Sequence, residues 1–185
     1  MSTKTEYQKM VAGELYDAGD AELVEMRTRA REMVQSYNQT GYDRQERTRA
    51  LQKILRKTGS NIDIQTPFYC DYGCHISVGN NFFANFNCVF LDCNYIQMGD
   101  NVFLGPNVQV YAATHPLVAA ERIKGPELAL PVIIGDNVWI GGGSIICPGL
   151  TIGNNTTIGA GSVVVKSIPP DVLAAGNPCR IIKTL

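Results

Sequence analysis

A six-residue repeat in the second half of the chain constrains the fold more than any other feature. Written in sixes, residues 134–169 read IGDNVW IGGGSI ICPGLT IGNNTT IGAGSV VVKSIP. The first position of each hexad is Ile or Val, and the second is mostly Gly. An earlier block has the same pattern: VGNNFF ANFNCV FLDCNY, two extra residues, and then MGDNVF LGPNVQ VYAATH.

A period of six matches neither the 3.6-residue period of an α-helix nor the two-residue alternation of a plain strand. It fits short strands separated by tight corners, with one aliphatic side chain of each strand pointing inward. Gly and Asn supply corners that need unusual backbone angles. Three strands complete a triangular coil, so we expect residues about eighteen apart to stack in neighbouring coils. The repeat therefore predicts a mainly β, parallel β-helix domain over residues 59–185.

The chain before the repeat has a different pattern and is expected to be helical. The segment AELVEMRTRAREMVQSYN has Asp20 at its N-cap position and predicts an amphipathic helix. Its apolar residues recur at spacings of three and four: Leu23, Met26, Ala30, Met33 and Tyr37. DRQERTRALQKILRKTG predicts another helix, ended by Gly59. The expected organisation is a helical segment over residues 1–58, followed by the β-helix domain with a C-terminal tail at 170–185.

Composition and charge argue against several classes of function. The net charge is −1 and the Lys and Arg residues are scattered, which gives no support for a nucleic-acid or anionic-membrane partner. The start MSTKTEYQKM lacks the apolar core of a signal peptide, and no later run is long enough to span a membrane, so we expect a cytoplasmic protein. The six cysteines contain no CxxC pair and are interpreted as small buried hydrophobic residues. A zinc cluster of Cys70, Cys74 and His75 is a minor alternative, and no metal is expected.

The hexads resemble the left-handed parallel β-helix of the hexapeptide acyltransferases. Four further segments resemble the maltose and galactoside O-acetyltransferases along nearly the whole chain: MVAGELYDAGDAEL, CDYGCHISVGNNFFANFNCVFLD, ATHPL and AAGNPCRIIK. The resemblance is closest to the maltose enzymes. It implies a left-handed β-helix, a homotrimer with active sites between subunits, and acetyl transfer from acetyl-CoA to a sugar hydroxyl.

His115 stands where the repeat stops. It ends a hexad, Pro116 follows, and the next hexad begins only at Ile134, so residues 116–133 are expected to leave the coil as an extruded loop. Acetyl transfer from a thioester to a hydroxyl needs a base, and a neutral imidazole with an ordinary pKa of about 6.5 suits this role. The resemblance implies that His115 in ATHPL is that general base. The alternative is a corner residue that caps the loop.

Asn85 is the second catalytic residue that the resemblance implies, as a hydrogen-bond donor to the oxyanion of the tetrahedral intermediate. An Asn at a corner is otherwise an ordinary turn residue. Asn85 begins the second face of its coil, whereas His115 ends the third face. Within one chain they therefore belong to different edges, and they can meet if an edge of one subunit packs against a neighbouring subunit.

A column of small residues suggests where the acetyl donor lies. Gly142 and Ala160 occupy equivalent positions of successive coils, with Gly105 and Asn85 beside and below them, which leaves a strip for an extended pantetheine. Small residues also favour tight corners without any ligand. The resemblance implies coenzyme A contacts at Asn85, Gly105, Gly142, Ala160, Val165, Lys166, Arg180 and Lys183. The last three bring positive charge for phosphates, whereas Val165 departs from the Thr of galactoside enzymes.

For the sugar acceptor, the resemblance implies Asp17, Asp71 and Asp92, whose carboxylates suit sugar hydroxyls but are equally compatible with solvated surface charges. Cys93 stands where galactoside enzymes have a further Asp, which favours glucose or maltose as acceptor. Other interpretations are a galactoside or xenobiotic acetyltransferase, a non-catalytic scaffold, and a γ-type carbonic anhydrase. The last needs three histidines around zinc, and this chain has two.

Overall fold

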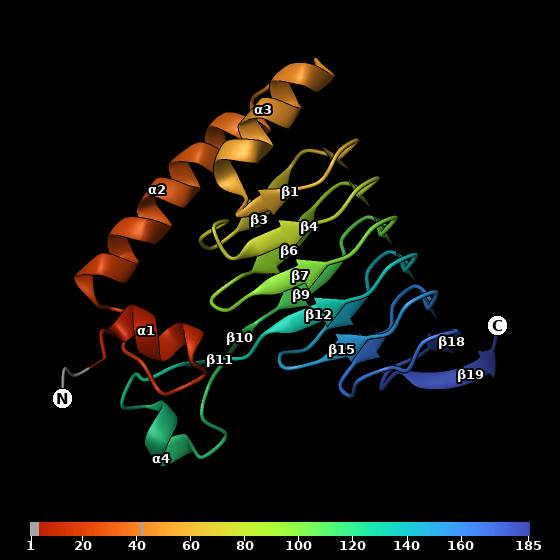
Figure 1. Cartoon of the computed structure of the whole chain (residues 1–185). Helices are drawn as coiled ribbons and strands as arrows, with labels where there is room; N and C mark the ends of the chain where they lie inside the picture. The colour runs from red at the N-terminus through yellow and green to blue at the C-terminus, as the bar shows by residue number, and fades with distance from the viewer. Residues whose placement is uncertain (1–3, 42) are drawn as a thin grey trace.

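The computed structural model describes residues 4–41 and 43–185, so residues 1–3 and 42 of the predicted helical segment lie outside the described residues. Helices lie against one end and one side of a stack of short strands (Figure 1). The helices are α1 (Glu6–Val11), α2 (Ala21–Asn38), α3 (Arg44–Ile54) and α4 (Ala119–Arg122).

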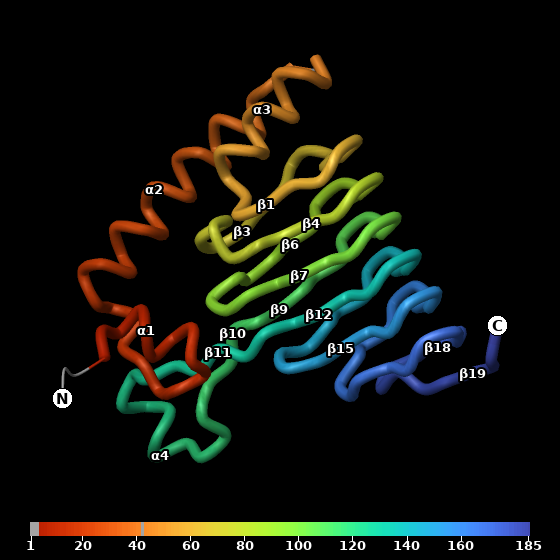
Figure 2. The backbone as a smooth tube through the Cα atoms, in the orientation of Figure 1, coloured from red at the N-terminus to blue at the C-terminus, as the bar shows by residue number. Residues whose placement is uncertain are grey.

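The strands form three sheets, which the chain visits in turn, and their pairing is parallel except between β18 and β19. The first sheet contains β1 (Lys57–Thr58), β4 (Ile76–Val78), β7 (Ile96–Met98), β12 (Val132–Ile134) and β15 (Thr151–Ile152). The second contains β2 (Asp63–Ile64), β5 (Phe83–Ala84), β8 (Phe103–Leu104), β13 (Trp139–Ile140), β16 (Thr157–Ile158), β18 (Val172–Ala175) and β19 (Arg180–Thr184). The third contains β3 (Phe68–Cys70), β6 (Cys88–Leu91), β9 (Gln109–Tyr111), β14 (Ile145–Ile146) and β17 (Val163–Val164). The tube in Figure 2 shows the successive coils stacked along one axis.

The first position of each hexad forms the core of the stack. Every one of these side chains, from Val78 in the lower block to Val164 in the upper block, is at most 5% exposed. Burying an aliphatic side chain contributes roughly 1.5–3 kcal/mol, so this column is the main apolar stabilisation of the domain. The prediction of a mainly β, parallel β-helix fold is confirmed.

The coil length differs between the two blocks. Ile134 lies opposite Ile152, which is the expected spacing of eighteen, but Val78 lies opposite Met98, a spacing of twenty. The spacing of twenty agrees with the two extra residues that the sequence places after FLDCNY, which lengthen the segment between β6 and Met98. The stack also contains a coil that begins at β1, before the first coil that the repeat identified.

One corner of every coil is held by a ladder of side chains. Its residues all have positive φ values of 54–58°, which Asn tolerates better than most residues: Asn61, Asn81, Asn101, Asn137, Asn155 and Asp171. The Nδ2 atom of each Asn donates to the side-chain oxygen of the next residue at 2.8–2.9 Å. A guanidinium nitrogen of Arg44 donates to Asn61 at 2.6 Å. The ladder thus begins at a cation and ends at the carboxylate of Asp171.

The helical prediction is correct for α2 and needs one correction for α3. Asp20 caps α2 by accepting a hydrogen bond from the Glu22 N–H, and the buried residues of α2 lie on one face. The sequence predicts that the second helix ends at Gly59, whereas α3 ends at Ile54. Leu55 is already extended, and the Arg56 N–H donates to the carbonyl oxygen of Ile76. Pairing with the coil therefore ends the helix before the glycine.

Both ends of the stack are covered. The helices α2 and α3 pack on each other and contact β1, β2 and β3 of the first coil. At the other end, β18 pairs parallel with β16, and β19 folds back antiparallel on β18. The predicted C-terminal tail is thus a hairpin that extends the second sheet and protects its last parallel strand.

A hairpin with a long loop interrupts the stack between β9 and β12. The strands β10 (Ala113–Thr114) and β11 (Leu128–Ala129) pair antiparallel outside the three sheets, and α4 lies between them in the sequence. The chain rejoins the stack at β12. In the described residues, no helix is both long and apolar enough to cross a membrane.

We expect the ladder to be sensitive to substitution at Asn101, because this residue both donates and accepts within it. Asn101→Ala removes these bonds and forces Ala into a left-handed conformation, and we expect a loss of about 1–3 kcal/mol in unfolding free energy. Asn101→Gly is the matched control, since it loses the same bonds without backbone strain. Thermal unfolding at fixed protein concentration should rank the wild type above Asn101→Gly, and Asn101→Gly above Asn101→Ala. Equal unfolding temperatures for the three proteins would contradict this account.

Candidate active site

His115 lies at the base of the extruded loop. It follows β10 directly, its side chain is exposed, and the next residue, Pro116, is buried. The register of β10 and β11 sets Thr114 opposite Leu128, so the hairpin determines where the loop leaves the stack. An exposed imidazole at this position is accessible to a ligand or to a neighbouring subunit.

Asn85 lies at a different corner, between β5 and β6. Its backbone N–H donates to the Leu104 carbonyl oxygen at 3.0 Å, which fixes the residue to the next coil. Its Oδ1 atom accepts the N–H of Phe86 at 2.8 Å. Because the oxygen of the side-chain amide is engaged in this way, the Nδ2 group is the part of Asn85 that can donate to a ligand.

The small residues form two adjacent columns along this corner. Asn85 and Gly105 follow paired strands β5 and β8, and their column is continued by Gly141, whereas Gly142 and Ala160 lie in the next column. The Gly161 N–H donates to the Gly142 carbonyl oxygen at 2.9 Å, which ties these coils together.

Gly105 is required by close approach of the backbone. A Cβ atom at this position would lie 2.5 Å from the Gly142 nitrogen, closer than real contacts allow. The corner therefore keeps a shallow profile along several coils, and an extended ligand can lie close to the main chain.

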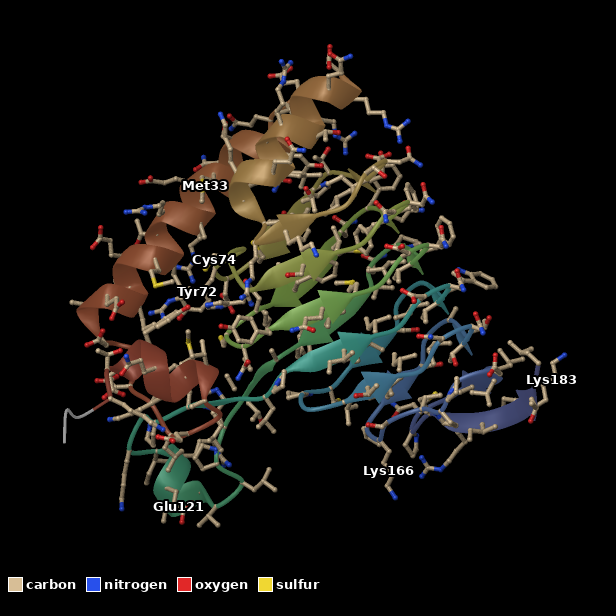
Figure 3. The ribbon with its side chains drawn as sticks, viewed as in Figure 1. Met33, Tyr72, Cys74, Glu121, Lys166 and Lys183 are labelled. Atoms are coloured by element: carbon tan, nitrogen blue, oxygen red, sulfur yellow. The ribbon has the colours of Figure 1, made fainter. Side chains whose placement is uncertain are left out.

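The basic residues lie at the end of the stack farthest from α2 and α3. Val165 and Lys166 are exposed at the corner after β17, and Arg180 and Lys183 are exposed on β19. Figure 3 shows Lys166 and Lys183 pointing outward at this end. Arg180 lies opposite Ala175, the last residue of β18, which pairs with β16, so its positive charge is near the Gly and Ala corner.

Three of the predicted acceptor residues, Asp71, Asp92 and Cys93, lie together at the third corner, where β3 and β6 end. Asp71 is partly buried, and the Cys93 thiol donates to its Oδ2 atom across 3.6 Å. Burial raises the pKa of Asp71 above its ordinary value, and it raises the pKa of Cys93 to about 12, which keeps the thiol protonated as a donor. Asp17 lies between α1 and α2 in the N-terminal helical segment (the head), where its Oδ1 atom accepts the Gly19 N–H at 2.8 Å and the side chain remains exposed.

Asp92 is fully buried beneath Asp71. Its Oδ1 atom accepts the N–H groups of Asp71 and Tyr72 at 3.0 and 2.8 Å, and its Oδ2 atom accepts the His75 N–H at 3.3 Å. Burial raises the pKa of Asp92 to about 7. The carboxylate thus holds the turn that presents Asp71, while Asp71 itself lies nearer the surface.

The second histidine is part of the packing. His75 is buried among the rings of Tyr7, Tyr72 and Tyr95, with centroid separations of 5.3–5.7 Å. Its Nδ1 atom lies 2.6 Å from the Asp92 carbonyl oxygen, and burial lowers its pKa. Across residues 4–41 and 43–185, no group of three or more His, Cys, Asp or Glu side chains is arranged to hold a metal ion.

Sequence reasoning did not identify Tyr16 and Glu127, which complete the third corner. The Tyr16 hydroxyl donates to Glu127 Oε2 at 2.9 Å, and the two residues also pair through their backbones. Arg27 of α2 donates to the Tyr72 hydroxyl at 2.6 Å nearby. Figure 3 shows Tyr72 between α2 and the strands. These contacts join segments that are far apart in the sequence, so no local sequence pattern predicts them.

The chain matches two sequence families: the maltose acetyltransferase hexapeptide capping motif over residues 9–59, and the bacterial transferase hexapeptide (six repeats) over residues 131–166. A maltose O-acetyltransferase from Clostridium difficile 630 has a solved structure with 49% identity and a TM-score of 0.97, covering 100% of this chain and 99% of that chain.

Two further proteins extend the comparison. The galactoside O-acetyltransferase of Escherichia coli (strain K12) is 40% identical over 96% of this chain and 88% of its own length. A hexapeptide-repeat acetyltransferase from Vibrio cholerae O1 biovar eltor, solved with acetyl coenzyme A, is 37% identical with a TM-score of 0.92, covering 98% of this chain and 99% of that chain. These similarities cover nearly the whole chain: the N-terminal helical segment, the coils and the C-terminal hairpin of β18 and β19. The chain is therefore an acetyltransferase with a left-handed parallel β-helix, and it belongs to the maltose and galactoside O-acetyltransferase family of hexapeptide-repeat enzymes.

Proposed function

We propose that this protein transfers the acetyl group of acetyl-CoA to a hydroxyl of a sugar such as maltose or glucose, with His115 as general base. The observation that carries the proposal is the exposed imidazole of His115 at the base of the β10–β11 hairpin, at the corner where Asp71 offers a carboxylate oxygen. Carboxylates accept hydrogen bonds from sugar hydroxyls, and a neutral imidazole accepts the proton of the hydroxyl that attacks.

The chemistry is direct transfer. The sugar oxygen attacks the thioester carbonyl carbon while His115 takes the hydroxyl proton, which forms the new C–O bond. The C–S bond then breaks, and the departing thiolate takes the proton from the imidazolium. An acetyl ester and the free thiol of coenzyme A result, and His115 returns to its neutral form.

Asn85 is the proposed donor to the oxyanion of the intermediate. Its Oδ1 atom is occupied by the Phe86 N–H, which leaves Nδ2 as the group that donates. A fixed amide that donates to a developing negative charge lowers the barrier more than a mobile one does, because no reorganisation is needed at the moment of reaction.

Acetyl-CoA is proposed to lie along the Gly and Ala corner. The flat profile at Gly105 and Gly142 suits an extended pantetheine, and exposed Ala160 continues the corner toward the basic end. Lys166, Arg180 and Lys183 would then receive phosphate groups. The complex of the Vibrio cholerae relative with acetyl coenzyme A supports this choice of donor.

The site is proposed to be shared between subunits of a homotrimer. Asn85 precedes β6 and His115 follows β9, so they lie at opposite ends of third-sheet strands, roughly 15–20 Å apart at about 3.3 Å per residue. A second chain is needed to bring the two groups to one substrate. The outward residues of the third sheet are mostly apolar, with Tyr69, Val89, Ile145 and Val163 in one column that Gln109 interrupts, and this surface suits packing between subunits.

For the acceptor, Asp71 and Asp17 are the proposed ligands of sugar hydroxyls. Asp92 is proposed to act through the turn that it holds, because its oxygens already accept three backbone N–H groups. Cys93 is proposed to orient Asp71, since its thiol donates to that carboxylate. A protonated thiol in place of a carboxylate favours a glucose- or maltose-type acceptor over a galactoside.

We expect His115→Ala to lower turnover by a factor on the order of 10²–10⁴, the usual effect of losing a general base. His115→Gln should lose as much, because its amide keeps hydrogen bonding but cannot take the proton. The measurement is free-thiol release from acetyl-CoA with glucose, maltose, a thiogalactoside and chloramphenicol as acceptors. Near wild-type turnover in either variant would rule out His115 as the base, and acetylation of chloramphenicol alone would rule out a sugar acceptor.

A large side chain on the Gly and Ala corner should block the binding of acetyl-CoA there. We expect Ala160→Trp to raise the Kd for acetyl-CoA at least about tenfold, while the Kd for the sugar changes little, because only the donor passes this corner. Thr151→Trp is the matched control, since Thr151 is also exposed but lies on the first sheet. Calorimetry that shows unchanged acetyl-CoA affinity in a folded Ala160→Trp protein would place the coenzyme elsewhere.

The shared site predicts complementation between two inactive proteins. His115→Ala and Asn85→Ala should each be weakly active alone. After subunit exchange at equal mixing, about a quarter of the interfaces pair an intact His115 with an intact Asn85, because cyclic contacts repeat independently around the trimer. Activity should recover to about that fraction of wild type. Verified exchange by mass spectrometry without recovered activity would mean that both residues act within one chain.

A further inference from the structure

The hairpin that carries His115 is too short to be stable by itself. β10 and β11 pair over Ala113 with Ala129 and Thr114 with Leu128. The observed pairing ends at Thr114 and Leu128. Extending the same register by one residue would set His115 opposite Glu127, and residues directly opposite on antiparallel strands have their Cβ atoms about 4.5–5.5 Å apart. Isolated two-stranded hairpins are marginal in water even when they are longer. Contacts from elsewhere must therefore hold the strand opposite His115 in place.

The N-terminal head supplies these contacts through Tyr16. The Tyr16 N–H donates to the Glu127 carbonyl oxygen at 3.1 Å, and the Glu127 N–H donates to the Tyr16 carbonyl oxygen at 3.0 Å. The Tyr16 hydroxyl donates to Glu127 Oε2 at 2.9 Å. Backbone and side chain of one head residue thus bind backbone and side chain of one loop residue. Tyr16 acts as a third strand beside the hairpin.

Tyr16 is itself firmly anchored. It is 2% exposed and belongs to a cluster of buried residues from the head, the third corner and β11: Met10, Leu23, Tyr72, Cys93 and Ala129. Buried Asn94 joins the same parts, because its Nδ2 group contacts the carbonyl oxygens of Ala129 at 2.9 Å and of Met10 at 3.2 Å. Figure 1 shows α1 lying beside β11 at this junction.

The loop beyond this junction is loosely attached. Leu117 is 93% exposed and Ile123 is 81% exposed. The short helix α4 has no side-chain hydrogen bond at its N-cap, and Figure 3 shows Glu121 on its outer side. Arg122 of α4 donates to the carbonyl oxygens of Pro116 and Leu117 at 3.1 Å, which closes the loop on itself. The pairing of Tyr16 with Glu127 is what attaches this loop to the N-terminal helical segment.

We propose that Tyr16 is a positioning residue for His115, acting through Glu127. By holding the strand opposite His115, it sets the position of the imidazole relative to the acceptor. The inference rests on the proposed role of His115 as general base. It gives the helical head a part in the reaction, in addition to its packing on the stack.

The test removes the hydroxyl group of Tyr16 and keeps its aromatic ring. We expect Tyr16→Phe and Glu127→Leu each to lower kcat on the order of tenfold, since small misplacements of a catalytic group have effects of this size or larger. The double variant should be no worse than either single one, because both remove the same bond. Glu127→Gln keeps an acceptor oxygen for the tyrosine and should retain activity. The Kd for acetyl-CoA should stay unchanged in all variants, and the pH dependence of kcat/KM should stay unchanged in Tyr16→Phe, which removes no charge.

Hydrogen exchange gives a readout that does not depend on activity. Backbone amides of residues 113–129 should exchange faster in Tyr16→Phe and Glu127→Leu, but not in Glu127→Gln. Tyr72→Phe is the matched control: it removes a buried hydroxyl from the same cluster, whose partner is Arg27 and not the loop. It should leave kcat and the exchange of residues 113–129 unchanged.

Three outcomes would overturn the inference. Tyr16→Phe with wild-type kcat and exchange would show that the hydroxyl positions nothing. Equal damage in Glu127→Gln and Glu127→Leu would show that the charge of Glu127 acts directly on the substrate. An equal loss of kcat and of exchange protection in Tyr72→Phe and Tyr16→Phe would show that the effect comes from the general packing of the cluster. If His115→Ala kept full turnover, the proposed function would fail, while the exchange of the loop would still report whether Tyr16 holds it.

Discussion

Every coil of this protein has to turn at the same place, and the ladder from Asn61 to Asp171 makes this possible. A non-glycine residue in the left-handed region costs of order 1–3 kcal/mol, so turning each coil there is unfavourable by itself. Here each turn residue also binds its neighbour along the stack, and the net value of such a bond is about 1 kcal/mol. The side-chain amides align in one direction between Arg44 and Asp171, and hydrogen bonds in a chain polarise and strengthen one another.

The stack that results is a rigid support whose three corners differ in chemistry. The ladder corner is structural. The corner after the second sheet is kept flat by residues such as Gly105, whose neighbour in the next coil leaves no room for a side chain. The corner after the third sheet is longer and polar, and it holds Asp71, Cys93 and the hairpin of His115. Chemistry is thus placed at corners, while the strands between them supply the apolar interior.

The polar corner is stabilised by two buried ionisable side chains, Asp92 and His75. Asp92 accepts three backbone N–H groups, and its main-chain oxygen lies against the His75 ring. Burial of a carboxylate and an imidazole is unfavourable for their charged forms, in agreement with the raised pKa of Asp92 and the lowered pKa of His75. These bonds hold the turn at Asp71 with little freedom, which suits a residue that has to meet a ligand in a defined orientation.

The amino-acid sequence by itself determined the inner column, the parallel coils and the Gly and Ala corner, because each depends on residue types that repeat at a constant short interval. It also indicated His115, where that interval is broken. Tertiary structure alone decided the coil that begins at β1, the early end of α3 at Ile54, and the burial of Asp92. It also decided the pairing of Tyr16 with Glu127, which are 111 residues apart. Such contacts arise from which surfaces meet after the coils have formed, and a local periodicity contains no information about distant partners.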